Sequence, residues 1–413
     1  MKYDVIIIGA GASGLYCAAH LPDKKVLIIE KNSRIGMKIL ASGSGQCNLT
    51  HGGYISAFYD HYGPRKAFVK FALNHHNNKQ VISFYESHGL KCIERSDGKV
   101  FPESLKASDV VDTLARCIKK ATLKKNEKVM RVEYLENHFK VFTDHGEYEG
   151  CELVIATGGR SYPALGSTGD GYGFAEHFGH SLRSVKPGLT GVVTRTKDFS
   201  ELQGISLDTV IVSLYKSKSN EADGSPSLKQ SVYNGPLLFT HFGLSGPVII
   251  NNSRYFDKGD LLTINFLGES YEVSEKFFID TAKSHGDKPL AFYLNQIKLP
   301  EALKEKLIGV DRSIKMSVIT KEKRKEILSH LTQYKVEIES LIGFNQAMVT
   351  VGGISHEEVD SKSMASKIQK GLYIVGEVVD VDGDTGGYNL QWAFSSGYLA
   401  AKSIGKYNST DHD

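Results

Sequence analysis

The most constraining feature of this chain lies at its N terminus, where an apolar run leads directly into a glycine-rich turn. Residues 3–21 read YDVIIIGAGASGLYCAAHL, and Gly9, Gly11 and Gly14 fit the pattern GxGxxG. Glycines at these positions allow a tight turn, a close approach of backbone to a pyrophosphate, and close packing of a helix on a strand. The helix would direct its N-terminal amides at the phosphates. The stretch therefore predicts the first strand, turn and helix of a dinucleotide-binding unit.

A second apolar run, KKVLIIE, ends at Glu30, at the distance expected for a carboxylate that binds a ribose hydroxyl. NAD and FAD share this arrangement, so the segment after Glu30 has to separate them. In an NAD-binding unit another helix normally follows, whereas here we expect the chain to turn at Gly36 and offer Lys38 as a cation. The chain then continues as ASGSGQCNLTH (41–51). We expect backbone amides from Ala41 to Gly45 to border the flat ring of a flavin; a flexible surface loop is the alternative.

Two later segments have the same character. CELVIATGGRSYPALGSTGDGYG predicts a buried strand that ends at Thr157 and Gly158, where backbone can approach a ligand. KGLYIVGEVVDVDGDTGGYNLQWAFSSGYLAAKSI predicts a strand, a glycine loop and a helix that begins near Tyr388 with its positive end toward the flavin. Because this C-terminal unit completes a site begun at residue 3, we expect a discontinuous domain.

The bulk properties bound the remaining possibilities. The chain has 413 residues and a net charge of only +3, so no polyelectrolyte partner is indicated. Its longest apolar runs have the length of strands, so no membrane span is indicated either. The first strand leaves no room for a signal peptide, and the five cysteines form no CxxC pair or metal-ligand spacing. We therefore expect a cytoplasmic protein with free thiols and no metal site. Neither the substrate nor the oligomeric state follows from the sequence.

The middle of the chain follows a different pattern. GISLDTVIVSLYKSK and DLLTINFL alternate as strands of a small barrel, with SNEADGSPSLKQ as a loop between them. From Glu272 to about Tyr334 the periodicity is helical. We expect an α/β, Rossmann-like FAD-binding domain of the glutathione-reductase type over 1–190 and 346–413, a β-barrel insertion over 191–271 and 335–345, and a helical subdomain over 272–334.

Four motifs in order resemble the BaiN/RdsA-type family of bacterial FAD-dependent oxidoreductases, which includes aminoacetone-oxidase-like proteins. They are EKNSRIGMKILASGSGQCNLTH, ATGGRSYPALGSTGDGYG, LLFTHFGLSGP and GEVVDVDGDTGGYNLQWAFSSGY. The resemblance covers nearly the whole chain. One departure concerns the loop GGGRCNxTN of the family, because Gln46 stands here in place of arginine and His51 in place of asparagine. A contact that requires a fixed positive charge at residue 46 is therefore in doubt.

The resemblance implies an FAD site built from residues far apart in the sequence. The implied residues are Gly9, Gly11, Ala12, Ser13, Gly14, Glu30, Lys31, Lys38, Ser42, Gly43, Val129, Thr157, Gly158, Gly376, Glu377, Gly387, Tyr388, Asn389 and Leu390.

The candidate catalytic residues are those able to move a proton while the flavin transfers a hydride at N5. Cys47 lies in the loop expected to reach the ring, and Tyr388 lies at the start of the last helix; for each the alternative is a purely structural role. His241 in LLFTHFGLSGP is a candidate substrate ligand or proton shuttle, although a histidine there is more often structural. Arg160, Tyr162 and His51 are weaker candidates for substrate contacts.

The resulting function is an FAD-dependent oxidoreductase whose small-molecule or RNA substrate lies between the FAD domain and the insertion. No second GxGxxG follows a strand, so NAD(P)H is expected at most as a transient electron donor. The family also contains a ribosomal RNA dihydrouridine synthase, which reduces the C5–C6 bond of uracil. The basic stretch ARCIKKATLKKNEKVMR (115–131) favours that alternative, although such runs are usually solvated helix faces. A second alternative is a non-enzymatic, flavin-binding redox sensor.

Overall fold

The computed structural model describes residues 2–195, 199–217, 231–309 and 311–407. The chain divides into two compact units, Met1–Gly188 with Phe344–Asp413, and Leu189–Gly343. The expected loop SNEADGSPSLKQ (219–230) lies outside the described residues.

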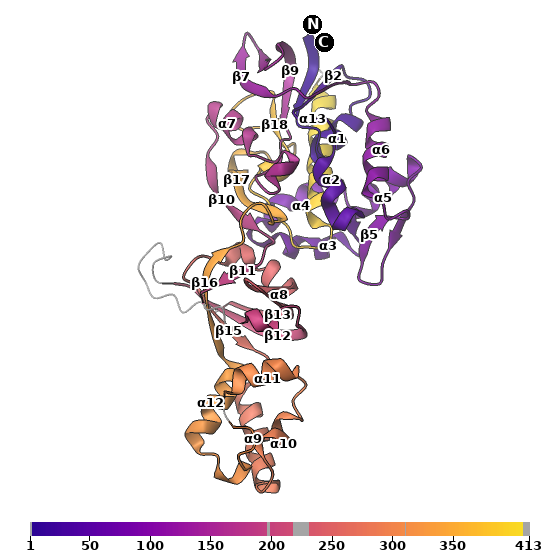
Figure 1. Ribbon diagram of the computed structural model, residues 1–413. Helices are drawn as coiled ribbons and strands as arrows, with labels where there is room; N and C mark the ends of the chain where they lie inside the picture. The colour runs from indigo at the N-terminus through magenta and orange to yellow at the C-terminus, as the bar shows by residue number, and fades with distance from the viewer. Residues whose placement is uncertain (1, 196–198, 218–230, 310, 408–413) are drawn as a thin grey trace. The chain divides into compact units, whose positions relative to one another are not determined.

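The first unit is built around a mixed, seven-stranded sheet (Figure 1). Its order is β6 (Thr122–Lys125), β2 (Val26–Glu30), β1 (Lys2–Ile8), β9 (Glu147–Ile155), β8 (His138–Thr143) and β7 (Val129–Leu135), with β18 (Leu372–Ile374) also paired to β9. Strand β1 runs parallel to both β2 and β9, with Ile8 opposite Ile29 and Ile155. Most of its side chains are buried because helices cover the sheet, as is typical of parallel strands. The carboxyl ends of β1, β2, β9 and β18 consequently lie at one edge.

Helix α13 (Tyr388–Tyr407) joins the end of the chain to its beginning. It packs on α1 (Ala12–Ala19), and Gly397 permits the contact, since a Cβ there would lie 2.6 Å from the Ser13 carbonyl oxygen. The first unit is therefore a discontinuous Rossmann-like domain, as expected from the sequence.

Smaller elements complete this unit. Its other strands pair as β3 (Thr50–His51), β5 (Lys99–Pro102) and β4 (Cys92–Glu94), and as β10 (Leu182–Gly188) with β17 (Val349–Ile354). Its other helices are α2 (Met37–Ala41), α3 (Ile55–Phe58), α4 (Lys66–His75), α5 (Asn78–Ser87), α6 (Ala107–Cys117) and α7 (Asp170–His177). The expectation that no helix follows Glu30 was wrong. The left-handed residue Gly36 (φ 66°) starts α2, and burial of Ile39 holds this short helix in place.

The second unit contains a closed barrel and a group of helices that share one hydrophobic core. The barrel strands follow the order β11 (Val192–Thr194), β14 (Gly243–Ser245), β13 (Ser231–Thr240), β12 (Ser206–Tyr215), β15 (Leu261–Asn265) and β16 (Tyr334–Leu341). The helices are α8 (Pro247–Ile250), α9 (Tyr271–Ser284), α10 (Leu290–Leu294), α11 (Glu301–Ile308) and α12 (Lys321–Thr332). The strand and helix periodicities of the sequence are confirmed here.

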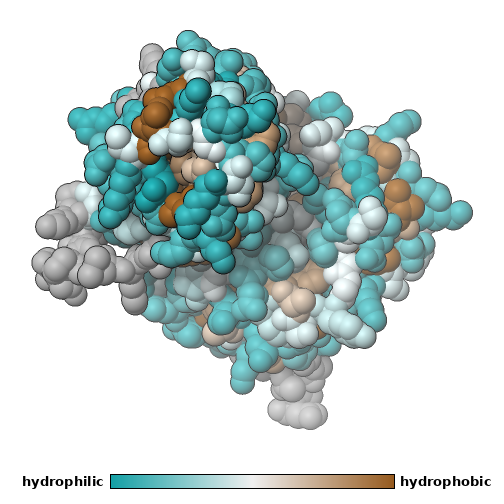
Figure 2. All heavy atoms as spheres, turned by 90° about the horizontal axis from the view of Figure 1, so that it is seen from below, coloured by the Kyte–Doolittle hydropathy of each residue, from teal (hydrophilic) through white to brown (hydrophobic). Residues whose placement is uncertain are grey.

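The face of the molecule seen in Figure 2 is largely hydrophilic, with hydrophobic residues in small separate groups. In the part of the chain that is described, no helix combines the length and the apolar character that crossing a bilayer would require.

Glu152 in β9 gives the fold a pH-dependent stability. Burial raises the pKa of its carboxyl group from 4.5 to about 7, against the opposing charges of Lys370 and Lys24. Its Oε2 atom is buried and has no hydrogen-bond partner among the described residues. Because the folded state binds the proton more tightly, this contribution to stability is complete below pH 4.5 and disappears as the pH rises to 7.

The substitution Glu152→Gln should remove this dependence, because glutamine resembles the protonated acid at every pH. Chemical denaturation across pH 4.5–8 should show the free energy of unfolding of the wild type falling by about 2 kcal/mol relative to that of the variant. Parallel curves for the two proteins would show that the carboxyl group does not titrate in this range.

Candidate FAD-binding site

The three glycines of the turn after β1 have two different roles: two are required by close packing of the backbone, and one faces open space. A Cβ on Gly9 (φ 103°) would lie 2.6 Å from the Ala156 oxygen, and one on Gly14 would lie 2.0 Å from the Gly9 oxygen. These two glycines are required by the protein itself. A Cβ on Gly11, at the N-cap of α1, would meet no atom within 4 Å. The open space at Gly11 fits a pyrophosphate at the start of the helix, next to Ala12 and the buried Ser13.

Glu30 is held firmly at the end of β2. Its carboxylate accepts hydrogen bonds from the amides of Ala10 (2.8 Å) and Asn32 (2.9 Å), and the residue is 9% exposed. It lines a cleft together with Ile8, Gly9, Ile29, Lys31, Glu127, Lys128, Val129, Thr157, Gly166, Asp170 and Phe174. A carboxylate at the wall of a cleft beside the glycine turn suits the adenosine end of a dinucleotide.

Lys31 extends from the same strand end and is already bound by the protein. Its ammonium group contacts Thr168 Oγ1 and Asp170 Oδ2, each at 2.5 Å. Burial alone would raise the pKa of the Asp170 carboxyl group, but the hydrogen bond and the charge of Lys31 outweigh it, so this pKa is lowered. Lys31 thus helps shape the cleft, and its predicted contact with the cofactor stays a prediction.

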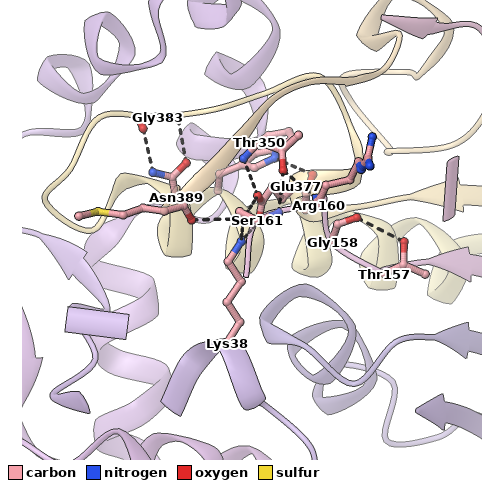
Figure 3. Close-up of polar contacts among 12 residues, drawn as sticks. Lys38, Thr157, Gly158, Arg160, Ser161, Thr350, Glu377, Gly383 and Asn389 are labelled. Carbon is pink, nitrogen blue, oxygen red and sulfur yellow. Dashed lines mark hydrogen bonds and ion pairs between the residues drawn. The ribbon is translucent and has the colours of Figure 1, made fainter. Parts of the chain in front are cut away.

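A second polar cluster joins four segments that are distant in the sequence (Figure 3). Lys38 of α2 contacts Glu377 Oε2 at 2.5 Å and also Ser161 Oγ. The other carboxylate oxygen, Glu377 Oε1, accepts from Ser161 Oγ (2.9 Å) and from the amide of Thr350 (2.8 Å). Thr350 Oγ1 in turn accepts from the amide of Arg160 at 2.7 Å. This cluster, Lys38–Ser161–Thr350–Glu377, ties the edge of the parallel strands together.

The sequence had pointed to Lys38 and Glu377 but not to their partners. Ser161 follows the turn at Thr157 and Gly158 closely enough that its position could have suggested it. Thr350 lies in the apolar run MVTVGGIS and carries no chemical signal of its own. The guanidinium group of Arg160 points away from the cluster in Figure 3 and lies 5.1 Å from the centre of the Phe344 ring.

The loop after α2 has unusual backbone angles. Ser42–Gly45 form a kinked 3₁₀ segment, and the kink is made by the left-handed residues Gly43 (φ 55°) and Ser44 (φ 56°). Gln46 follows, and its Oε1 accepts a hydrogen bond from Arg95 Nη2 at 2.8 Å. A guanidinium group therefore does lie beside this loop, although it comes from the turn between β4 and β5.

The C-terminal loop borders the same region. Gly387 (φ 101°) lies against β3, where a Cβ would meet the Thr50 oxygen at 2.5 Å. The side chain of Asn389 bonds to Gly383 and Asp384, so only its backbone can face a cofactor. Leu390 is partly buried on the first turn of α13. Gly376 (φ 77°) leaves no room for a Cβ, which would lie 2.5 Å from Ser13 Oγ.

Tyr388 is buried between two imidazole rings. Its ring stacks on His61 (4.0 Å between centroids, 15°) and on His51 (5.5 Å, 13°). Burial and the nearby charge of Asp384 raise the pKa of its hydroxyl group to about 12. The hydroxyl is therefore protonated at neutral pH, as a proton donor requires. Its predicted role in catalysis stays a prediction.

Cys47 is fully buried, and burial raises the pKa of its thiol to about 12, partly offset by a hydrogen bond with Ser42. The thiol is protonated at neutral pH, but its burial favours a packing role over contact with substrate. We expect Cys47→Ser to retain FAD and turnover, and thiol reagents to modify the exposed Cys151 before Cys47. A large fall in turnover, measured with the flavin content unchanged, would instead support proton donation.

His241 lies in the second unit, in the exposed turn between β13 and β14, with its ring edge-to-face against Phe242 (5.0 Å). Its predicted role as a substrate ligand or proton shuttle stays a prediction.

Comparison with known proteins identifies the family of the chain. Residues 3–403 match the family described as HI0933-like protein Rossmann domain. The chain is 33% identical to the ribosomal RNA dihydrouridine synthase of Escherichia coli strain K12, over 98% of both chains. It is 34% identical to the enzyme of that name from Haemophilus influenzae, over 97% of this chain and 98% of the relative. It is 30% identical to the 3-dehydro-bile acid delta(4,6)-reductase of Clostridium scindens, over 96% and 98%.

Among solved structures, E. coli quinol fumarate reductase FrdA superimposes with a TM-score of 0.52 at 17% identity, over the whole of this chain and 71% of FrdA. This likeness concerns the fold. The family match and the full-length relatives identify the chain as a member of the HI0933-like family and an FAD-dependent oxidoreductase.

Proposed function

We propose that this protein reduces a carbon–carbon double bond conjugated to a carbonyl group, and that its substrate is a uridine base of ribosomal RNA. The observation that carries the proposal is the full-length similarity to two ribosomal RNA dihydrouridine synthases, at 33% and 34% identity. The bile acid reductase, whose name also describes reduction of double bonds, supports the reaction class.

Residues from several segments of the chain would bind the cofactor. The turn at Gly11 and the carboxylate of Glu30 would hold the pyrophosphate and the adenosine end. The Lys38–Ser161–Thr350–Glu377 cluster would fix the strand ends beside the flavin end of the cofactor. FAD, when bound, supplies the hydride that the substrate receives. NAD(P)H is the proposed source of electrons for the flavin.

A cationic hollow supports an RNA substrate. Lys24, Arg116, Lys119 and Lys120 line a cavity of about 230 Å³, together with apolar residues that include Leu21, Val26 and Ile118. The basic stretch 115–131 that supplies three of these residues runs through the end of α6, strand β6 and the start of β7, so it is not a single helix face. Clustered cations of this kind contact RNA phosphates.

Complementation tests this proposal. The chain would be expressed in an E. coli strain that lacks its own ribosomal RNA dihydrouridine synthase, and dihydrouridine in the ribosomal RNA would be quantified by mass spectrometry. We expect the modification to return with the wild-type chain and not with Gly11→Val. The RNA assignment would be contradicted by absent dihydrouridine together with NAD(P)H-dependent reduction of a Δ4,6-3-oxo steroid. A flavin that NAD(P)H reduces but neither substrate reoxidises would indicate a redox sensor instead.

A further inference from the structure

The turn between β4 and β5 presents an arginine beside the glycine loop of the FAD site. Arg95 begins this turn, which is closed by hydrogen bonds from the Gly98 amide to the Arg95 oxygen and from the Arg95 amide to the Lys99 oxygen, both 2.9 Å. The guanidinium carbon lies 4.0 Å from the centre of the Phe101 ring, and Nη2 donates to Gln46 Oε1 at 2.8 Å. The exposed side chain of Arg95 is therefore held by the Phe101 ring and by the Gln46 side chain.

The partners that fix Arg95 do not neutralise it. The amide of Gln46 and the ring of Phe101 carry no net charge. Asp97 in the same turn pairs with Lys99 at 2.7 Å; the hydrogen bonds of Lys99 and, to a smaller extent, the charge of Arg95 lower the pKa of Asp97, but across the described segments no ion pair includes Arg95. A guanidinium group has five N–H donors in a planar fork, and most of them remain for an external acceptor.

This arginine adjoins both loops of the cofactor site. Gln46 follows directly on the Ser42–Gly45 turn, and a Cβ on Gly43 would lie 3.4 Å from the Phe101 ring. His51 reaches the same turn, with Nε2 3.1 Å from the Asp97 oxygen, and stacks on Tyr388. A ligand at these loops would therefore meet a positive charge that is already held in place.

We propose that Arg95 is a phosphate-binding residue of the substrate site, and that it contacts a backbone phosphate of the RNA next to the base that is reduced. The RNA source of the phosphate rests on the proposed function. The same chemistry could be supplied by a phosphate of NAD(P)H. The fork of the guanidinium group matches two phosphate oxygens, and its preorganisation limits the entropy lost on binding.

Two substitutions separate charge from structure. Arg95→Gln removes the charge. Gln46→Glu keeps an acceptor for Arg95 and should strengthen their contact, yet it neutralises the guanidinium group. Arg183→Gln is the control, because Arg183 is an exposed arginine of the same unit that already pairs with Glu357 at 2.8 Å. Flavin absorbance and thermal melting would show that each variant is folded and loaded.

Binding of a ribosomal RNA fragment would be measured by fluorescence anisotropy at salt concentrations from about 50 to about 200 mM. Phosphate contacts weaken over roughly this range, so the measurement reports on them. We expect both Arg95→Gln and Gln46→Glu to weaken binding by about five- to tenfold and to reduce the slope of log affinity against log salt by about 0.7, the value for one phosphate of a single strand. Arg95→Lys should recover part of the loss. Arg183→Gln should match the wild type.

A parallel measurement of flavin reduction by NADPH and NADH distinguishes the two sources. Loss confined to RNA binding supports the RNA phosphate, whereas a raised KM for the nicotinamide with unchanged RNA affinity assigns Arg95 to the electron donor. If the wild type does not bind RNA, the proposed function fails. The KM for the nicotinamide then remains as the test of whether Arg95 binds a phosphate. The inference is overturned if Gln46→Glu and Arg95→Gln leave both RNA affinity and the nicotinamide KM unchanged.

Discussion

Gly11→Val should yield a folded protein that purifies without the yellow colour of FAD. The position is an N-cap with φ −85° and ψ −167°, angles that valine adopts readily, and the Cβ would meet no protein atom within 4 Å. The branched side chain would occupy the space in which we place the pyrophosphate. We expect FAD affinity to fall at least about 100-fold, equivalent to roughly 3 kcal/mol. Stability of the apoprotein should fall only by about 1 kcal/mol, because glycine is the better N-cap.

Gly14→Ala is the matched control for this prediction. Its Cβ would lie 2.0 Å from the Gly9 oxygen, so the backbone of α1 would have to move away from β1. We expect the apoprotein to lose about 1–3 kcal/mol of stability whether or not FAD is added. Visible absorbance and thermal melting, with and without FAD, measure both effects. A Gly11→Val protein that stays fully yellow would show that the pyrophosphate is bound elsewhere.

The sequence predicted the parts of the fold that repeat a strong local pattern. The buried strands at Val5 and Leu153, the glycine turn and the helix from Tyr388 each carry a signal within a few residues. Their assembly into one discontinuous domain was predicted because the C-terminal strand, loop and helix would complete the site begun at residue 3. The short helix α2 was missed, because five residues carry too little periodicity to reveal a helix.

Interactions that depend on tertiary contact were beyond such reasoning. Nothing near Thr350 indicates that its amide would meet Glu377, and nothing near Arg95 indicates that it would bind Gln46. Both contacts join residues whose proximity is set by packing of the sheet and not by a local motif. The positive charge that the family has at residue 46 is replaced here by that of Arg95, which contacts Gln46 but lies 49 residues away in the sequence.

Glu377→Ala should weaken both the fold and the retention of FAD, because one carboxylate organises the edge of the sheet where the site lies. Its loss leaves the ammonium group of Lys38 without its anion and the amide of Thr350 without its acceptor. Since the Lys38 and Glu377 side chains are 28% and 19% exposed, water can compensate in part. We expect a destabilisation of about 2 kcal/mol.

Thermal melting of the apoprotein and an FAD titration measure the two effects of Glu377→Ala separately. Asp60→Ala is the control, since Asp60 pairs with Lys66 on the surface, where the side chains are 82% and 61% exposed and such a pair contributes at most about 0.5 kcal/mol. Glu377→Gln should lie between them: its remaining oxygen can still accept from Ser161 and Thr350, but its amide would face Lys38 as a second donor. An alanine variant that melts like the Asp60 control and binds FAD normally would show that Lys38, Ser161 and Thr350 hold the site without the carboxylate. The order alanine, glutamine, control in both measurements is what a charged cluster that positions the cofactor requires.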